Sequence, residues 1–273
     1  MQFDIDRYFP DTSQESGDSG RASFEEKRPL YLAASKHFLT HYREEIKSVH
    51  RGGAAGTTVV KHITAMTDTL IRKLFRSITR DVAQPGRGRE HLTLMAIGGY
   101  GRGELNPHSD IDLMFLYGGK DAARVEDIAQ KLLYFLWDMR LDVGYSVRTL
   151  QDCVEMASSD LTVRTALLDS RVLAGSRVFF REFEKVMLTQ ILAKKSDSFI
   201  RDKVAELHKR REKYGSSVYL LEPNVKESEG GLRDLHTALW VMKIKYKVKD
   251  PKELVVKGIL SEEIGRASCR ERV

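Results

Sequence analysis

The sequence predicts an α+β fold: a small mixed β-sheet with helices, flanked by N-terminal helices and followed by a C-terminal helical domain. Two observations lead to this prediction. Stretches with apolar residues at helical spacing stand towards both ends of the 273-residue chain, and short apolar runs bounded by glycines stand between them. The predicted order is two helices, then β-β-α-β, then a helical tail, and we find no internal repeat.

Two helices are predicted first, after a polar lead-in. Residues 11–21 are rich in Ser, Gly and Asp and lack any apolar period, so we expect 1–23 to be a disordered lead-in. Apolar residues then recur at helical spacing over 24–50 and, on one face, over 58–80. The glycine-rich stretch 51–56 separates these two helices.

Three strands are predicted next. The apolar runs 91–97 and 111–117 each end in a pair of glycines, which is typical of a strand that runs into a turn. A helix is predicted over 121–140, because its apolar residues fall on one face, and a third strand is predicted over 142–149. These elements form the predicted core.

The rest of the chain is predicted to be mainly helical, over 151–207 and again over 232–247. The sequence therefore divides into a lead-in at 1–23, N-terminal helices at 24–83, a sheet-bearing core at 84–150, a helical domain at 151–263 and a tail at 264–273. The tail is rich in Arg and has no apolar period. It looks like a translation of a common sequencing adapter, so we expect it to be an artefact rather than native protein.

Composition and charge restrict the class of protein. Hydrophobic residues make up 41% and charged residues 31%. No apolar run approaches the roughly 18 residues of a membrane span, and the start lacks a signal pattern, so we expect a cytoplasmic protein without membrane contact. Two cysteines are too few for a disulfide scaffold. The net charge of +6 is spread over mixed-sign helices, and no strip interleaves aromatic with basic residues, so nucleic-acid binding is not expected.

The segment 96–116 carries the residues suited to chemistry. Asp110 and Asp112 stand two apart at the head of a predicted strand, where side chains at i and i+2 project to the same face. Two carboxylates this close repel each other unless a cation lies between them. Mg²⁺ often relies on one or two carboxylates plus substrate phosphates. The pair therefore predicts a Mg²⁺ site, at which Mn²⁺ is an alternative.

The glycines before this pair predict a phosphate cradle. Gly98 and Gly99 end a strand where the backbone can turn tightly and approach a ligand, and successive N–H groups in such a turn bind anions. Arg102 follows closely enough to meet a phosphate oxygen, and Ser109 could donate its hydroxyl to the same triphosphate. The glycine spacing fits neither a dinucleotide fingerprint nor a P-loop.

The glycine turn and the carboxylate pair together are more specific than either feature alone. An apolar strand into Gly-Gly, an Arg three residues later, and Ser-Asp-x-Asp opening another apolar strand resembles the signature of the DNA-polymerase-β-like nucleotidyltransferase superfamily. Such enzymes usually carry a third carboxylate on the neighbouring strand, and the resemblance makes Asp142 the candidate. Asp160 and Asp169 are alternatives, and a purely structural role for Asp142 at the helix-to-strand junction is equally open.

Longer segments resemble one family within that superfamily, the bifunctional uridylyltransferase/uridylyl-removing enzymes of bacterial nitrogen control. They are residues 98–113, 143–149, 160–171 and 222–240, and the resemblance covers about 24–263. It implies that UTP and a tyrosyl hydroxyl of the PII signalling protein react to give PII-UMP and pyrophosphate. A carboxylate near the metal would serve as the base.

The 222–240 segment has two interpretations. Two glycines precede a helix predicted from Leu232, so outward-pointing backbone donors, together with Lys226 and Arg233, make the segment a candidate nucleotide-binding element. The alternative is a helix-entry loop held by an Arg–Asp pair. The sequence does not decide between these two interpretations.

Two other functions remain open. A glutamine synthetase adenylyltransferase would share the Gly-Gly and Asp-x-Asp core but not the 222–240 segment. An inactive module that binds nucleotide or PII is a second alternative, against which the intact Asp110 and Asp112 argue. The family's hydrolase half needs paired His-Asp metal ligands, and no His-Asp dipeptide occurs here. We therefore expect a fragment without the uridylyl-removing and regulatory domains.

Overall fold

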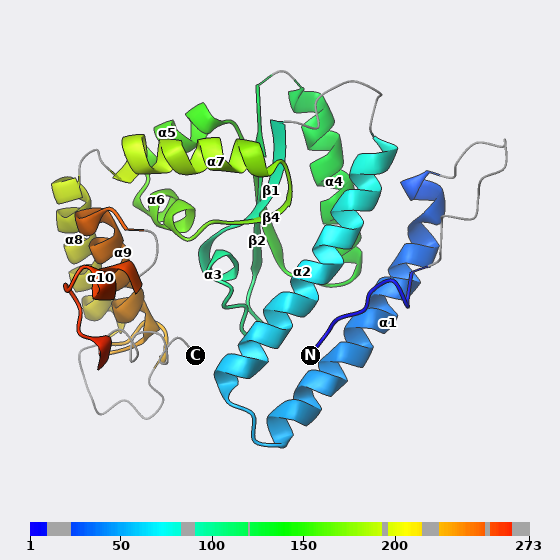
Figure 1. Cartoon of the computed structure of the whole chain (residues 1–273), viewed down its shortest axis with the longest axis horizontal. Helices are drawn as coiled ribbons and strands as arrows, with labels where there is room; N and C mark the ends of the chain where they lie inside the picture. The colour runs from blue at the N-terminus through cyan, green and yellow to red at the C-terminus, as the bar shows by residue number, and fades with distance from the viewer. Residues whose placement is uncertain are drawn as a thin grey trace. The chain divides into compact units, whose positions relative to one another are not determined.

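The computed structural model describes residues 1–9, 23–82, 91–119, 121–192, 196–214, 224–248 and 252–263 (Figure 1). These residues form two compact units. The first comprises residues 1–150 and 169–181, and the second comprises 151–168 together with the residues from 182 onward. The chain therefore leaves the first unit after residue 150, returns to it at 169 and leaves it again after 181.

The first unit combines long helices with a β-sheet. In chain order its elements are α1 (Phe24–Arg51), α2 (Gly56–Asp81), β1 (Leu92–Ala96), the short helical turn α3 (Gly98–Gly101), β2 (Ile111–Tyr117), α4 (Ala122–Asp138), β3 (Val143–Arg148) and β4 (Arg171–Gly175). A capping box starts α1: the Ser23 hydroxyl accepts from the Glu26 N–H (3.2 Å), and the Glu26 carboxylate accepts from the Ser23 N–H (2.6 Å). The two helices predicted first are present.

The strands form a mixed sheet in the order β3-β2-β1-β4. β1 is antiparallel to both β2 and β4, whereas β2 and β3 are parallel and are joined through α4. A parallel pair needs such a crossover, because a tight hairpin can join only antiparallel strands. The predicted α+β fold with a small mixed sheet is confirmed.

One face of this sheet is buried under helices. Alternate residues of β1 and β2 join one apolar core with side chains of the helices, and its fully buried members include Phe38, Leu70, Leu74, Ile128 and Phe135. Figure 1 shows α2 and α4 lying against the strands. Ile111 and Leu113 belong to this core, so the two-residue period of a strand places Asp112 on the opposite face of β2.

Residues 1–9 correct the expectation that all of 1–23 is a disordered lead-in. Ile5 and Phe9 are buried in the same core as α1 and α2, and the Asp4 N–H donates to the Tyr42 hydroxyl (3.0 Å). The two apolar side chains leave water only because the helices provide a surface for them, which composition could not show. Residues 10–22 lie outside the described residues.

β4 is a strand that was not predicted, within a region from residue 151 that is otherwise mainly helical, as predicted. Its residues pair with β1, with a register shift between Leu94 and Met95, and bring 169–181 into the first unit. Only Leu173 among its five residues is buried, so the strand carries no alternation that periodicity could detect, and it exists because β1 offers it a pairing edge. The sheet-bearing unit therefore extends beyond the predicted boundary at residue 150.

A buried carboxylate on α2 holds the sheet and the α3 turn together. Asp68 is 5% exposed. It accepts hydrogen bonds from the Tyr100 hydroxyl (2.7 Å), from two nitrogens of Arg171 (2.6 and 3.0 Å) and from Arg72 (3.0 Å). Arg72 Nε also donates to the Leu173 carbonyl oxygen (2.9 Å). Charge-assisted hydrogen bonds in surroundings of low dielectric constant are stronger than neutral ones, so Asp68 ties α2 firmly to α3 and β4.

The second unit is helical within the described residues. Its elements are α5 (Leu150–Ser159), α6 (Leu161–Leu168), the π-helical turn η3 (Met187–Leu192), α8 (Ser196–Tyr214), α9 (Leu232–Tyr246) and α10 (Lys252–Val256), and α7 (Arg177–Val186) passes into it from the first unit. Phe199, Trp240 and Ile244 form a buried cluster. Over the described ranges, no helix is both long enough and apolar enough to cross a membrane.

Replacing Asp68 tests whether this carboxylate stabilises the first unit. Asp68→Ala leaves the Arg171 guanidinium and the Tyr100 hydroxyl without their acceptor, and we expect the free energy of unfolding to fall by about 3–5 kcal/mol. The matched control is Asp127→Ala, which removes an exposed partner of Lys131 (2.8 Å). It should lower the free energy of unfolding by less than about 1 kcal/mol. Urea unfolding followed by circular dichroism measures both, and equal losses would contradict the assignment.

Candidate active site

The backbone at the end of β1 turns sharply beside the start of β2. The Ile97 N–H donates to the Asp112 carbonyl oxygen (3.1 Å), and the chain then enters α3. Gly98 has a φ of 60°, a left-handed conformation that glycine adopts at no steric cost. N–H groups at the start of a helical turn have no partner within it, and these are the donors that a phosphate group would meet here.

The Asp112 carboxylate lies between two glycines. A Cβ on Gly98 would lie 3.3 Å from Asp112 Oδ2, and a Cβ on Gly144 would lie 2.9 Å from Oδ1. Gly144 stands opposite Asp112 in the parallel β2–β3 pairing. The two glycines therefore create the space that the carboxylate occupies. Gly144 is not among the site residues predicted from the sequence, although a glycine inside a strand indicates the close approach of another group.

Ser109 and Asp110 stand just ahead of β2. Both residues are exposed and follow a turn in which the Ser109 N–H donates to the Asn106 carbonyl oxygen (3.1 Å). His108 in this turn has a φ of 66°, which is uncommon for a residue with a side chain. The structure thus brings Ser109, Asp110 and Asp112 to one end of β2, next to the α3 turn.

Asp142 is exposed and lies directly before β3. Its carbonyl oxygen accepts a hydrogen bond from the Ile111 N–H (2.9 Å), so its backbone adjoins the residue between Asp110 and Asp112. Among the residues that the structure describes, however, no group of three or more His, Cys, Asp or Glu side chains is placed to hold a metal ion. A role for Asp142 as third carboxylate stays a prediction.

The two alternative third carboxylates have structural partners. Asp160 caps α6, where its Oδ1 accepts from the N–H groups of Thr162 (2.7 Å) and Val163 (3.0 Å). Asp169 is buried, and its Oδ2 accepts from Arg102 Nη1 (2.9 Å). These contacts account for both residues without a metal ion.

Arg102 is held by two carboxylates. Its Nε donates to Glu104 (2.6 Å) and its Nη1 to Asp169 (2.9 Å), and the side chain is 14% exposed. Burial by itself would lower the pKa of the Arg102 guanidinium, but Asp169 and Glu104 outweigh burial and raise this pKa. Nη2 lies 3.7 Å from where a Cβ of Gly99 would stand. Arg102 thus supports the turn through two nitrogens and directs the third towards Gly99.

Tyr100 and Gly101 anchor the α3 turn. Tyr100 is 1% exposed and donates its hydroxyl to Asp68 (2.7 Å). Burial, and then the Asp68 carboxylate, raise the pKa of Tyr100 well above its usual value, so the phenol stays protonated as the donor. A Cβ on Gly101 would lie 1.7 Å from the Asp169 carbonyl oxygen, so only glycine fits there. These supports were not predicted from the sequence, because Asp68, Tyr100 and Asp169 are distant from one another in the chain.

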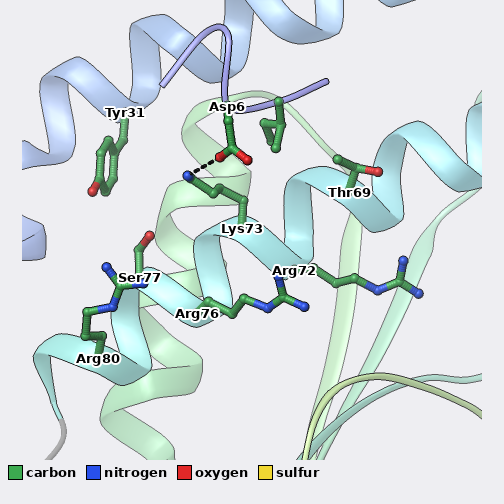
Figure 2. Close-up of a pocket in the computed structure, with 9 residues that line it drawn as sticks. Asp6, Tyr31, Thr69, Arg72, Lys73, Arg76, Ser77 and Arg80 are labelled. Carbon is green, nitrogen blue, oxygen red and sulfur yellow. Dashed lines mark hydrogen bonds and ion pairs between the residues drawn. The ribbon is translucent and has the colours of Figure 1, made fainter. Parts of the chain in front are cut away.

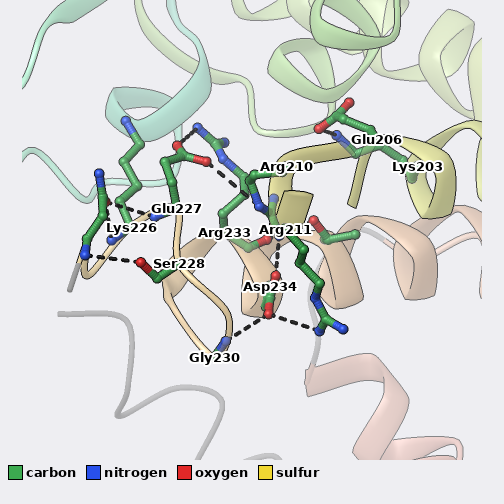
Figure 3. Close-up of polar contacts among 12 residues, drawn as sticks. Lys203, Glu206, Arg210, Arg211, Lys226, Glu227, Ser228, Gly230, Arg233 and Asp234 are labelled. Carbon is green, nitrogen blue, oxygen red and sulfur yellow. Dashed lines mark hydrogen bonds and ion pairs between the residues drawn. The ribbon is translucent and has the colours of Figure 1, made fainter. Parts of the chain in front are cut away.

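Lys226 and Arg233 lie in the second unit, at the loop that enters α9 (Figure 3). Lys226 is exposed. Arg233 Nη2 pairs with Glu227 (3.2 Å), and its guanidinium lies 5.7 Å from the centre of the Trp240 ring. Arg233 therefore already has an anionic partner and an aromatic one within its own unit.

Asp234 holds this loop, in agreement with the structural interpretation of the segment. It accepts from the Gly230 N–H (2.9 Å), from Arg210 and from Arg211 (3.4 Å), as Figure 3 shows. Both arginines belong to α8, so the Arg–Asp pairing links α8 to the start of α9. Arg233 takes no part in it.

Two family models match the chain. "GlnD PII-uridylyltransferase" matches residues 198–271, and "Putative nucleotidyltransferase DUF294" matches residues 40–150, which include the α3 turn and the Asp110–Asp112 pair. The first match extends into the tail at 264–273. That tail lies outside the described residues, and its assignment as an artefact stays a prediction.

Two similar proteins are named bifunctional uridylyltransferase/uridylyl-removing enzymes. The one from Rhodospirillum rubrum is 38% identical over 252 residues, which cover 90% of this chain and 27% of the relative. The one from Azospirillum brasilense is 38% identical over 238 residues, which cover 86% of this chain and 26% of the relative. The chain thus spans about a quarter of the length of these relatives.

A solved structure, "Crystal structure of the toxin-antitoxin with AMP-PNP", aligns with 52% of this chain and 93% of its own at 17% identity. The TM-score is 0.28. This likeness is too distant to carry an assignment.

Two glycines of the α3 turn should respond differently to alanine. Gly101→Ala forces a Cβ against the Asp169 carbonyl group, and we expect the free energy of unfolding to fall by about 1–3 kcal/mol or more. Gly99→Ala brings its Cβ only into ordinary contact with Arg102. This variant should change the free energy of unfolding by less than about 0.5 kcal/mol. Thermal unfolding compares the variants, and similar melting temperatures would show that Gly101 is not confined as described.

Proposed function

Because this chain belongs to the GlnD PII-uridylyltransferase family, we propose that it carries a nucleotidyltransferase site that transfers UMP from UTP to a tyrosyl hydroxyl of a PII protein. The observation that supports this most directly is the Asp112 carboxylate between Gly98 and Gly144, beside a Gly-Gly turn. Nucleotidyl transfer needs phosphate donors and a metal-binding carboxylate side by side. A cytoplasmic location is part of the proposal, and binding of nucleic acid or of a membrane is not.

Asp110 and Asp112 are the residues that would hold the metal ion. The donor set fits a hard cation, since it consists of carboxylate oxygens at the end of one strand, with Asp112 confined by Gly98 and Gly144. When bound, Mg²⁺, or Mn²⁺ in its place, supplies positive charge that offsets the charge of the triphosphate during displacement at phosphorus. Two carboxylates plus phosphate oxygens suffice for such an ion, so Asp142 is free to act in another role.

The α3 turn would bind the triphosphate. Backbone N–H groups of Gly98 and Gly99 would donate to phosphate oxygens, and the Ser109 hydroxyl would add a neutral donor at the same end of β2. Arg102 would act mainly by positioning, because Glu104 and Asp169 bind two of its nitrogens. Its Nη2 beside Gly99 is the atom that would meet a phosphate oxygen.

The proposed reaction is an in-line displacement at the α-phosphorus of UTP. The tyrosyl oxygen bonds to that phosphorus, the bond from the α-phosphorus to the oxygen of the β-phosphate breaks, and pyrophosphate leaves. A tyrosine hydroxyl has a pKa of about 10, so a base must take its proton at neutral pH. Asp142 is the candidate, because it is exposed and its backbone adjoins Ile111, between the two proposed metal ligands.

In the second unit, the residues that we consider for contact with the nucleotide or with PII are Lys226 and Arg233. Lys226 is exposed, and its charge suits a phosphate or an acidic side chain. A ligand contact by Arg233 would have to compete with Glu227, which already binds its guanidinium. We therefore assign the ligand contact to Lys226 first, and a supporting role in the loop to Arg233.

Asp112→Asn tests the proposed metal ligand. Loss of one charged ligand should reduce transfer of labelled nucleotide to purified PII by more than about 100-fold, since even outer partners of metal ligands are worth about 10–100-fold. Asp127→Asn, at an exposed position on α4, should leave the rate unchanged. The wild-type protein is also assayed with each of the four nucleoside triphosphates, to determine which nucleotide it transfers. Wild-type turnover by Asp112→Asn would exclude the metal role, and a preference for ATP would favour an adenylyltransferase.

Gly99→Ala tests the phosphate cradle separately from the fold. The new Cβ meets only Arg102 Nη2 in the protein, but it would block the approach of the triphosphate, so we expect a several-fold higher KM for UTP; Gly99→Val should have the larger effect. Gly52→Ala at the end of α1, where a Cβ also has room, is the control. An unchanged KM in both Gly99 variants would place the triphosphate elsewhere.

A further inference from the structure

A cavity of about 250 Å³ lies between the N-terminal segment, α1 and α2 in the first unit. Figure 2 shows that much of its wall is one stripe of α2 that begins at Thr69. Arg72, Arg76 and Arg80 stand at i, i+4 and i+8 of that helix, and Lys73 lies beside them. Four basic side chains therefore share one cavity, and none of them belongs to the proposed nucleotide site.

Two of these cations are compensated within the protein. Lys73 pairs with Asp6 (2.6 Å), and Arg72 donates to Asp68 (3.0 Å) and to the Leu173 carbonyl oxygen (2.9 Å). The contacts with Asp68 and Leu173 hold Arg72 in place. Part of the positive wall is therefore arranged before any ligand arrives, which lowers the entropy lost on binding.

Arg76 and Arg80 are not compensated in this way. Neither side chain makes an ion pair or a hydrogen bond with any residue that the structure describes, and both residues are exposed. Like charges four residues apart on a helix repel each other and destabilise it. An anion in the cavity would remove this repulsion, so the stripe is better suited to the bound state than to the free one.

We propose that this cavity binds a small anion that carries phosphate groups, at a site separate from the nucleotide site. Arginine forks match phosphate oxygens in pairs, and the hydroxyls of Tyr31 and Ser77 on the cavity wall add neutral donors. The cavity is smaller than the roughly 300–1,000 Å³ of pockets for drug-sized ligands. This size favours an inorganic or small organic phosphate over a nucleotide.

Asp6 competes with this anion for Lys73. Its carboxylate bonds Lys73, as the dashed line in Figure 2 marks, but its side chain is 79% exposed, and an exposed ion pair contributes little stability. A phosphate group can therefore displace it. Removal of the Asp6 charge should strengthen anion binding, whereas removal of the Arg76 and Arg80 charges should weaken it.

Calorimetric titration of the 273-residue chain with inorganic pyrophosphate tests the proposal. EDTA removes divalent metal, so that the proposed nucleotide site carries no metal ion, and sodium chloride at equal ionic strength is the blank. Wild type should bind saturably, and the double variant Arg76→Gln/Arg80→Gln should bind at least tenfold more weakly. The control Arg43→Gln/Arg51→Gln removes the same charge from exposed positions of α1 and should change the affinity less than twofold.

Two further measurements separate this cavity from other sites. Asp6→Asn should bind pyrophosphate at least twofold more tightly, and UTP binding with Mg²⁺ should stay within twofold of wild type in the Arg76→Gln/Arg80→Gln variant. No saturable binding, equal weakening in both double variants, or unchanged affinity in Asp6→Asn would overturn the proposal. Loss of UTP binding in the first double variant would also overturn it, because the cavity would then be part of the nucleotide site.

Discussion

The position of the α3 turn depends on a buried carboxylate, Asp68, which is not one of the candidate site residues. Asp68, on α2, accepts hydrogen bonds from the Tyr100 hydroxyl of the turn and from the Arg171 guanidinium at the start of β4. A buried charge of this kind is stable only when its partners are all in place. The turn, the edge strand and the helix must therefore be assembled together, and the glycines of the turn are fixed as a consequence.

The residues around the candidate active site divide into candidate ligands and supports. Asp112 owes its position to two neighbours without side chains, Gly98 and Gly144. Arg102 looks like a ligand in the sequence, yet two of its nitrogens bind Glu104 and Asp169. The proposed binding of phosphate oxygens and a cation would need such fixed surroundings, since dipoles that are already oriented need no reorganisation when charge develops.

Charge placement distinguishes supporting arginines from candidate ligands within the described residues. In the second unit three arginines face acids: Arg210 and Arg211 of α8 bind Asp234, and Arg233 of α9 binds Glu227. On α2, by contrast, Arg76 and Arg80 line a cavity without an acidic partner among those residues. Compensated arginines hold the fold together, and uncompensated ones are available to an anion.

The sequence by itself determined the fold class, the two N-terminal helices, three of the four strands and the local pattern of the site, because periodicity and short spacings are local properties. The tertiary structure alone decided the rest. β4, Ile5 and Phe9 depend on surfaces made elsewhere in the chain, and the Asp68 cluster joins residues from distant elements. The cavity beside the basic stripe of α2 forms only where the N-terminal segment and α1 meet that helix. Contacts between residues far apart in the chain have no spacing that a sequence could display.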